Sequence, residues 1–156
     1  MMEDTFGRTI TYLRLSVTDL CNYRCCYCMA PEGVEKTAHG AVCSLEELRD
    51  MTAAAVACGV RKVRITGGEP LATPETPELC RRLLDAGFEV LLETNGSLPI
   101  AEIPREVRKI LDCKLPGSGM AERNDFSNYA LLAPHDEVKF VISCRADFDA
   151  MLEVIR

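Results

Sequence analysis

Three closely spaced cysteines, Cys21, Cys25 and Cys28, form the pattern in this sequence that most clearly indicates chemistry. They follow a Cys-x-x-x-Cys-x-x-Cys spacing inside a segment, 18–43, that we predict to be a long loop. Thiolates are the usual protein ligands of iron–sulfur clusters, and this short spacing lets one loop surround a cubane. Because three thiolates ligate three irons, the fourth iron is left open for another ligand. The pattern therefore predicts a 4Fe–4S cluster with three protein ligands.

A zinc site is the alternative interpretation of the same loop. Structural zinc needs four protein ligands, and Cys26 or His39 is available as the fourth. The nine cysteines are odd in number and unevenly spaced, which disfavours a disulfide framework and favours metal or redox chemistry. Cys26 has the weaker claim, since its neighbours fit the three-ligand pattern without it.

A glycine-rich turn, Gly67-Gly68-Glu69-Pro70, is the second motif that points to a ligand. Glycine has no Cβ, so the backbone of such a turn can approach a bound molecule closely. The Glu69 carboxylate can accept a hydrogen bond from an ammonium group. A plain turn is the alternative, because glycine and proline are common turn residues.

The elements that position these motifs alternate between strands and helices along the chain. Alternating elements of this kind predict a parallel α/β sheet with about five β/α units, whose ligands bind at the carboxyl ends of the strands. The cysteine loop, the GGEP turn, the ETNG loop and the PGSG loop each follow a predicted strand, so we expect them on one rim. The predicted strands span 12–17, 60–66, 88–94, 109–115 and 137–143, and the predicted helices span 44–58, 77–86, 102–108, 124–132 and 147–156.

The cysteine motif after the first strand and GGEP after the second resemble the radical S-adenosylmethionine (SAM) superfamily. The resemblance implies a partial (β/α) TIM-like barrel with a 4Fe–4S cluster and SAM as cofactors. In that superfamily the amino and carboxylate groups of SAM chelate the open iron. One electron then splits SAM into methionine and a 5′-deoxyadenosyl radical, which abstracts hydrogen from the substrate. The residues that the resemblance assigns to SAM are Gly67, Gly68, Glu69, Pro70, Thr94, Asn95 and, more weakly, Ser118.

The first half of the chain, about 6–71, resembles the GTP 3′,8-cyclase family of molybdenum cofactor biosynthesis, through the runs TYLRLSVTDLCN and VRKVRITGGEPL. That resemblance implies that Arg14, Lys62 and Arg64 bind a nucleotide substrate. Alternation along two adjacent strands puts Arg14 and Arg64 on one face, where cations are suited to holding phosphates. Solvated surface charge is the alternative role for these three residues.

The second half, about 79–148, resembles the 7-carboxy-7-deazaguanine synthase family of queuosine biosynthesis. Its best signals are the pattern Asp112-x-Lys114-x-Pro-x-Ser-Gly and the run DEVKF. Asp112 and Lys114 alternate in phase on one strand, so they either pair with each other or face the substrate. That family places a magnesium-binding threonine where this chain has Ala30, which has no side-chain oxygen, so magnesium assistance is in doubt.

The 156 residues suit a single domain, 1–156, although the chain ends inside a predicted helix without a cap signal, which leaves room for a longer natural polypeptide. The net charge of −6 disfavours bulk nucleic-acid binding. No run of apolar residues is long enough to cross a bilayer and no signal peptide is visible, so the cytoplasm is the default location.

The function that these observations favour is a lyase-type radical SAM enzyme, similar to the synthase, that acts on a pterin or purine-type heterocycle. A cyclase-like enzyme is the first alternative, and a noncatalytic iron–sulfur module or an inactive fragment is the second. The expected partners are a small heterocyclic substrate, a low-potential electron donor of the flavodoxin or ferredoxin type and, as a possibility, a second copy of the chain.

Overall fold

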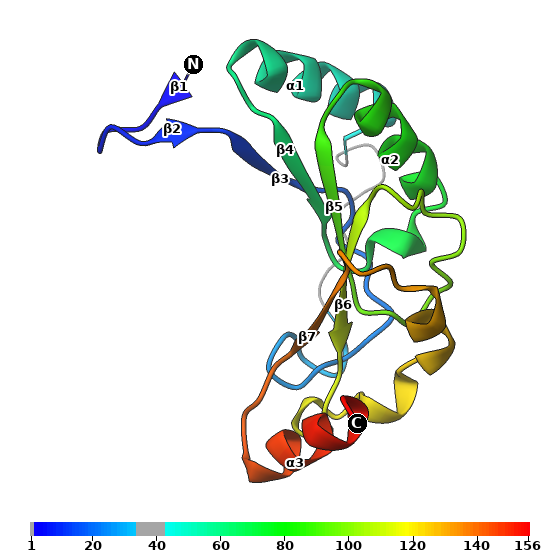
Figure 1. The fold of residues 1–156 in the computed structure, drawn as a ribbon. Coiled ribbons are helices and arrows are strands. Elements are labelled where there is room, and N and C mark those ends of the chain that lie inside the picture. The colour runs from blue at the N-terminus through cyan, green and yellow to red at the C-terminus, as the bar shows by residue number, and fades with distance from the viewer. Residues whose placement is uncertain (1, 34–42) are drawn as a thin grey trace.

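The computed structural model describes residues 2–33 and 43–156. Its centre is a parallel sheet of five strands in the order β3–β4–β5–β6–β7 (Figure 1). Since every strand lies beside the next one in sequence and all run in the same direction, their carboxyl ends share one edge. The strands are β3 (Tyr12–Ser16), β4 (Lys62–Thr66), β5 (Glu89–Thr94), β6 (Arg108–Cys113) and β7 (Glu137–Phe140).

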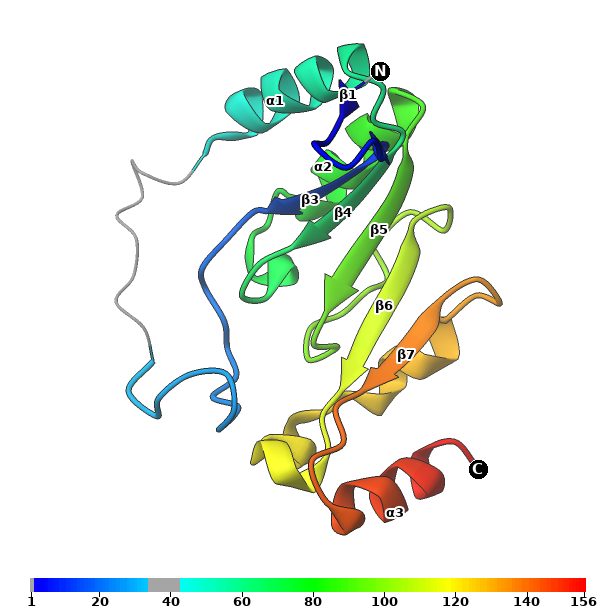
Figure 2. The same cartoon turned by 90° about the vertical axis from the view of Figure 1, so that its left-hand side faces the viewer.

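One face of the sheet is apolar and packs against helices α1 (Leu45–Ala57) and α2 (Thr76–Asp85). Val63 and Ile65 of β4 lie in register with Val90 and Leu92 of β5, and all four side chains are buried. The strand residues that alternate with these core positions point to the opposite face of the sheet, which we call the open face. It extends from Arg14 on β3 to Lys139 on β7. Figure 2 looks onto this face, with α2 behind the strands.

The observed elements confirm the predicted α/β fold. Helix α1 begins with the capping box formed by Ser44 and Glu47. Its C-cap residue, Cys58, is followed by Gly59, which has a φ of 95°. The last helix, α3, spans Arg145–Val154, two residues earlier at each end than predicted. The strands predicted at 109–115 and 137–143 are shorter at their carboxyl ends, because both segments turn away to form the rim.

The helix predicted at 102–108 is wrong, since turns occupy this segment. Ile100, Ile103 and Val107 imitate the spacing of a helix, yet each is a buried anchor that holds a turn against the core. Local backbone hydrogen bonds join Ile103 to Ile100 and Val107 to Pro104, and Pro104 itself has no N–H to donate.

The crossover from β6 to β7 is built from short 3₁₀ turns. The predicted helix at 124–132 is a 3₁₀-helix, η5 (Phe126–Leu131), preceded by η3 (Pro116–Ser118) and η4 (Ala121–Arg123). These short turns keep the PGSG loop close to the carboxyl end of β6, at the rim.

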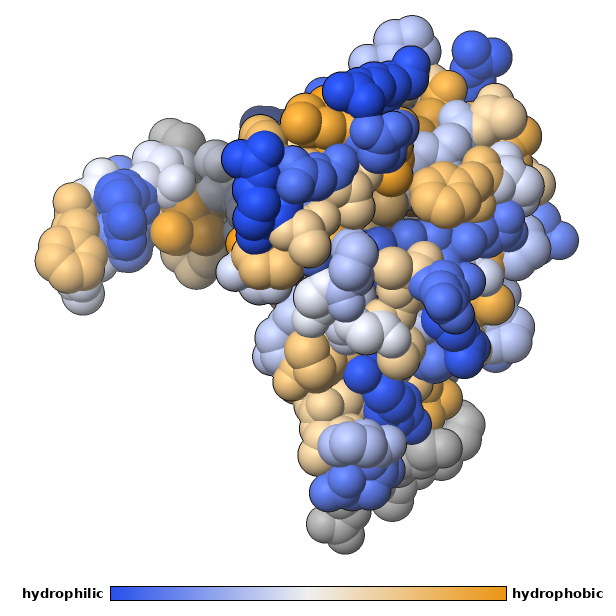
Figure 3. Space-filling model, turned by 90° about the horizontal axis from the view of Figure 1, so that it is seen from below, coloured by the Kyte–Doolittle hydropathy of each residue, from blue (hydrophilic) through white to orange (hydrophobic). Residues whose placement is uncertain are grey.

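A small antiparallel hairpin, β1 (Met2–Glu3) and β2 (Thr9–Ile10), precedes the sheet and has no counterpart in the sequence-based prediction. Seen from below, the hairpin projects from the body, and hydrophilic and hydrophobic residues are interspersed over the rest of the face (Figure 3). Within the described part of the chain, no helix combines the length and the apolar character that a membrane span requires.

Candidate active site

The GGEP turn lies against the backbone of the cysteine loop. The Gly68 N–H donates to the Thr18 carbonyl at 2.8 Å, and the Glu69 N–H donates to the Leu20 carbonyl at 2.6 Å. Gly67 has a φ of 147°, and a Cβ there would lie 2.5 Å from the Thr18 oxygen, while a Cβ on Gly68 would collide with the Leu20 carbonyl. The glycines are therefore needed for contact with the protein's own backbone, whereas the sequence had suggested close approach to a ligand.

Glu69 is fully buried and joins two rim loops. Its Oε1 accepts hydrogen bonds from the Thr94 hydroxyl at 2.7 Å and the Leu71 N–H at 3.0 Å, and its Oε2 accepts one from the Asn95 N–H at 2.7 Å. Burial raises the pKa of this carboxyl, and the three hydrogen bonds oppose that rise. Glu69 thus fastens the turn that follows β4, including the buried Pro70, to the end of β5.

Asn95 extends the same network to the cysteine loop. Its Nδ2 donates to Asn22 Oδ1 at 2.9 Å, and Asn22 is the neighbour of Cys21. Ser97 completes the group, because its hydroxyl accepts from Asn22 at 2.7 Å and donates to Asn95 Oδ1 at 2.6 Å. Three of the predicted rim loops therefore meet as expected, held by side chains as well as backbone.

The three predicted cluster ligands lie on one loop, with Cys25 buried, Cys21 half-buried and Cys28 exposed. Burial raises the pKa of the Cys25 thiol, the charge of Lys114 lowers it, and the neighbouring Cys28 and Cys21 raise it further. The Cys25 thiol thus lies within electrostatic range of both other predicted ligands. Within residues 2–33 and 43–156, however, no group of three or more His, Cys, Asp or Glu side chains is arranged as a metal site.

The donor chemistry of this loop fits a cluster with three protein ligands, because iron–sulfur clusters are bound by thiolates. A backbone hydrogen bond of 2.8 Å from Cys28 to Cys25 holds these two residues in one tight turn. Cys26, the first candidate for a fourth zinc ligand, instead points its thiol at the Gly117 carbonyl, 2.9 Å away. His39, the second candidate, lies outside the described residues.

Ala30 gives no support to a magnesium site on this loop. Its side chain has no oxygen, and its carbonyl already accepts a hydrogen bond from Gly33 at 2.8 Å. Since magnesium requires oxygen ligands in near-octahedral geometry, the residues here do not fit that ion.

Asp112 and Lys114 form the ion pair that was one of their two predicted roles, with 2.9 Å between Oδ2 and Nζ. Lys114 is buried, and its Nζ also lies 3.4 Å from the hydroxyl of Tyr27 on the cysteine loop. Although burial opposes a charged ammonium, the hydrogen bond and charge of Asp112 raise the pKa of Lys114 above its usual range. Lys114 is therefore a charged group directed at the cysteine loop.

The three predicted substrate cations lie together on the open face. Arg14 and Arg64 are register partners on β3 and β4, as alternation predicted. Lys62 pairs with Glu89 at 2.8 Å and Arg64 with Glu93 at 3.4 Å, whereas Arg14 has no hydrogen bond or ion pair within the residues that the structure describes.

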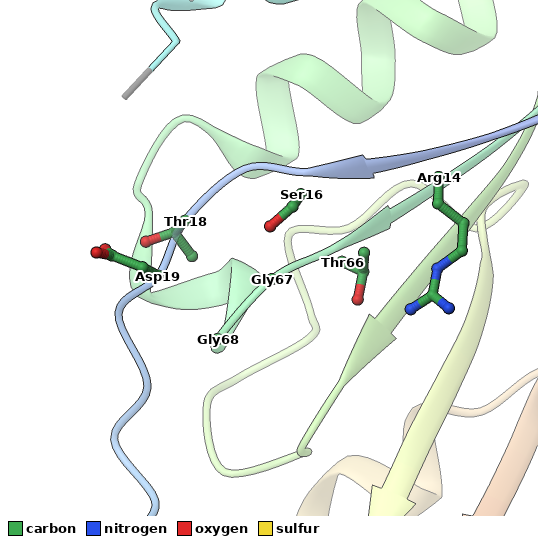
Figure 4. Close-up of a pocket in the computed structure, with 7 residues that line it drawn as sticks. All are labelled: Arg14, Ser16, Thr18, Asp19, Thr66, Gly67 and Gly68. Atoms are coloured by element: carbon green, nitrogen blue, oxygen red, sulfur yellow. The ribbon is translucent and has the colours of Figure 1, made fainter. Parts of the chain in front are cut away.

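Arg14 lines a cavity of about 450 Å³ at the carboxyl ends of β3 and β4. Figure 4 shows that the side chains of Arg14 and Thr66 extend to the same side of these two strands. The cavity reaches from this guanidinium to the GGEP turn, so it joins the predicted substrate and SAM regions. Its lining residues are Arg14, Ser16, Thr18, Asp19, Thr66, Gly67 and Gly68.

Ser118, the weaker SAM candidate, is buried in the PGSG loop. Its hydroxyl donates to the Leu115 carbonyl at 2.6 Å and accepts from the Met120 N–H at 3.0 Å. Its carbonyl accepts from the Cys26 N–H at 3.1 Å. In this structure Ser118 shapes the turn that supports the cysteine loop, and a contact with SAM stays a prediction.

Sequence reasoning missed Glu93 and Lys139, which connect the open-face residues. Lys139 Nζ lies 2.6 Å from Glu93 and 3.3 Å from Asp112, so it bridges β5 and β6 from its position on β7. Asp112 and Lys139 are register partners on β6 and β7. Aligning the two predicted strands in a parallel sheet could therefore have revealed this ion pair from the sequence.

The fold and the site together define a radical SAM protein. The Radical SAM superfamily model matches residues 15–156, so the chain belongs to this superfamily. Among solved structures, it is similar to Streptococcus suis SuiB bound to S-adenosylmethionine, with a TM-score of 0.68 and 15% identity over 93% of this chain and 37% of that one. It is also similar to QueE from Escherichia coli, with a TM-score of 0.63 and 20% identity over 91% and 67% of the two chains.

Two groups of curated relatives match the sequence more strongly. A GTP 3′,8-cyclase of Geobacter sulfurreducens is 51% identical over 106 residues, covering 67% of this chain and 32% of the relative. A 7-carboxy-7-deazaguanine synthase of Koribacter versatilis is 39% identical over 157 residues, covering 96% and 63% respectively. The chain therefore spans about a third of that cyclase and under two thirds of that synthase.

Proposed function

We propose that this chain is a radical SAM enzyme that acts on a pterin or purine-type heterocycle in a lyase-type reaction similar to that of 7-carboxy-7-deazaguanine synthase. The observation that carries the proposal is the joined rim, where Glu69 and Asn95 connect the GGEP turn, the end of β5 and the cysteine loop beside a cationic face. The similarity to a synthase along 96% of the chain supports this choice.

Cys21, Cys25 and Cys28 would hold the cluster and the rim loops would hold SAM, and together these two groups would supply the radical chemistry for hydrogen abstraction. The chain's own residues are proposed to bind and orient the cofactors and the substrate. Glu69 fixes the turn against which the methionyl group would be held.

Arg14 is the natural anchor for the substrate, since its guanidinium lines the cavity and makes no hydrogen bond or ion pair among the described residues. Arg64 and Lys62 lie on the next strand, where each already pairs with a glutamate. Arg14 is therefore the cation that we propose first for a carboxylate or phosphate, with Arg64 and Lys62 as neighbouring candidates. The two substrates considered are 6-carboxytetrahydropterin, for a synthase-like reaction, and GTP, for a cyclase-like reaction. Both are anionic, so a cationic face suits either one and leaves the choice between them to experiment.

A GTP 3′,8-cyclase-like reaction is the second candidate. The 51% identity to a cyclase and the alignment of Arg14 with Arg64 in adjacent strands favour it. Either reaction needs an external low-potential electron donor, for which a flavodoxin or ferredoxin type is proposed, and a cytoplasmic setting that keeps the thiols reduced.

The test is anaerobic reconstitution with iron and sulfide, reduction with dithionite, and chromatographic measurement of 5′-deoxyadenosine after addition of SAM. We expect 6-carboxytetrahydropterin to increase 5′-deoxyadenosine release more than GTP does. The reverse preference supports the cyclase-like reaction. A stable cluster that never cleaves SAM contradicts enzymatic function and favours a noncatalytic module or an inactive fragment.

The substrate anchor has its own test, the substitution Arg14→Ala. Because a charge-assisted hydrogen bond contributes about 1.5–3 kcal/mol, we expect KM to rise roughly ten- to a hundredfold. The release of 5′-deoxyadenosine without substrate should change little. An unchanged KM would contradict a role of Arg14 in substrate binding.

A further inference from the structure

Lys114 is a buried cation that directly follows β6 and contacts the cysteine loop. Its backbone is fixed by Asn124, whose Oδ1 accepts from the Lys114 N–H at 2.9 Å and whose Nδ2 donates to the Lys114 carbonyl at 2.7 Å. Its Nζ lies 3.4 Å from the Tyr27 hydroxyl and 5.6 Å from the centre of the Tyr27 ring. Tyr27 stands between Cys25 and Cys28 in the sequence, so the ammonium is directed at the centre of the ligand loop.

The environment of Lys114 keeps it charged without cancelling its effect on the loop. Asp112 is its 2.9 Å partner, but Asp112 also pairs with Lys139 at 3.3 Å, so the carboxylate is shared between two cations. Lys139 also pairs with Glu93 at 2.6 Å, and Glu93 pairs with Arg64 at 3.4 Å. The linked network of three cations and two carboxylates therefore carries one net positive charge, and Lys114 is its member against the cysteine loop.

We propose that Lys114 is the charge-compensating residue of the cluster site, and that its fixed positive charge raises the reduction potential of the bound cluster. The proposal rests on the proposed function for the presence of the cluster. A 4Fe–4S cluster with three thiolates gains one negative charge on reduction, and net charge near the cluster is one of the factors that set its potential. A nearby buried cation stabilises the reduced form more than the oxidised form, because little water screens the interaction.

This role differs from the substrate contact suggested by the sequence. The side chain of Lys114 is 9% exposed and covered by Tyr27, whereas the side chain of Lys139 on the same face is 43% exposed. A residue that receives substrate from solvent needs an exposed side chain like that of Lys139. The buried side chain of Lys114 instead suits a permanent electrostatic role.

The experiment is a redox titration of the reconstituted full chain, monitored by electron paramagnetic resonance without SAM or substrate. In Lys114→Met, we expect the midpoint potential to become more negative by about 59 mV, which is a tenfold change in a one-electron equilibrium. Lys114→Arg should restore most of the wild-type potential, since it keeps the charge. Asp112→Asn should move the potential in the positive direction, because it removes the neighbouring anion.

Arg108→Met is the matched control, since Arg108 is an exposed cation on the same face of β6 at the end away from the rim and pairs with Glu137. It should leave the potential unchanged. Equal potentials in wild type and Lys114→Met overturn the proposal, as does a shift of the same size in Arg108→Met. If Lys114→Met loses the cluster, retention in Lys114→Arg supports a charge role, and loss in both variants overturns it.

This measurement separates the inference from the proposed function. Wild-type protein with a redox-active cluster and no SAM cleavage contradicts the enzymatic proposal, while the potentials of the variants still test Lys114. Conversely, SAM cleavage with an unchanged potential in Lys114→Met contradicts only the inference.

Discussion

The GGEP turn and the cysteine loop lie at the same edge of the sheet but differ in how far the protein itself completes them. The turn is closed by the buried Glu69 carboxylate, which accepts three hydrogen bonds. The loop presents three thiols, of which Cys28 is exposed and Cys25 buried, without a formed metal site in the described residues. The same rim thus contains one part whose polar groups satisfy each other and one part whose thiols do not form a group of this kind in the described residues.

This difference has a physical reason. Carboxylates and backbone amides can satisfy each other inside the protein, so the Glu69 network is stable without a cofactor. Three thiolates repel one another, and only a metal cluster supplies the positive charge that holds them together. The comparison therefore teaches that the protein completes the GGEP turn by itself, whereas the cysteine loop, if it binds the proposed cluster, depends on that ligand for its final arrangement.

The largest expected effect is on the cysteine loop. Cys25→Ala should abolish the cluster, because two thiolates cannot retain it at this open position, and the iron content after reconstitution measures the loss. Cys26→Ala is the matched control, since its thiol contacts the Gly117 carbonyl instead. Equal iron content in Cys25→Ala and wild type would show that the ligand assignment is wrong.

The contact between the two parts is tested by Gly68→Ala. The new Cβ would collide with the Leu20 carbonyl, so we expect a loss of roughly 2–3 kcal/mol in the free energy of unfolding. Urea denaturation of the cluster-free protein measures it. Gly87→Ala is the comparison, because a Cβ at Gly87 would meet no described atom within 4 Å and only the φ of 84° is unfavourable there. Equal losses in both variants would contradict the contact argument.

The GGEP turn is tested by Glu69→Gln. The amide has a single acceptor oxygen, so at least one of the donors from Thr94, Asn95 and Leu71 loses its partner, at a cost of about 2 kcal/mol. Denaturation of the cluster-free protein measures the change. Glu89→Gln removes an exposed ion pair with Lys62 and should cost well under about 1 kcal/mol. A stable Glu69→Gln variant would remove the distinction between the two parts of the rim.

The smallest effect concerns the support of the PGSG loop by α3. Asp147 accepts hydrogen bonds from Ser143 and from the Gly117 N–H, and these hold the pKa of its carboxyl well below its usual value of 3.8. A lowered pKa in the folded state gives stability that is present above the unfolded-state value and lost as the pH falls below it. Unfolding of wild type should therefore become easier between about pH 5 and roughly pH 3.

Asp147→Asn should flatten this acid dependence, and Asp149→Asn is its control on the same helix. Asp149 is exposed and pairs only with Arg145 among the described residues, so its replacement should leave the profile unchanged. The same slope in wild type and Asp147→Asn would show that another group governs acid stability.

Much of the fold was predictable, because alternation and local spacing express it. Arg14 and Arg64 were placed on one face from their phase, and the sheet register confirms it. The error at 102–108 arose because Ile100, Ile103 and Val107 have helical spacing but anchor turns in the core. Local sequence patterns indicate which residues are buried, but they do not indicate whether the backbone at those residues is a helix or a series of turns.

The candidate site residues could be named from the sequence, whereas the contacts between them could not. Cys21, Cys25, Cys28 and the GGEP turn carry spacing signals that a reader can recognise in one dimension. The acceptor role of Glu69 toward Thr94 spans 25 residues, and the approach of Lys114 to Tyr27 spans 87, so no local pattern encodes either contact.

By itself the sequence determined the superfamily, the candidate ligand loop and the alternation of strands and helices, because each depends on residue type and spacing within a short segment. Only the tertiary structure decided that the glycine pair serves the protein's own backbone and that Lys114 lies against the cysteine loop. The reason is that burial and charge pairing depend on distances between segments, and those distances are set when the sheet has formed.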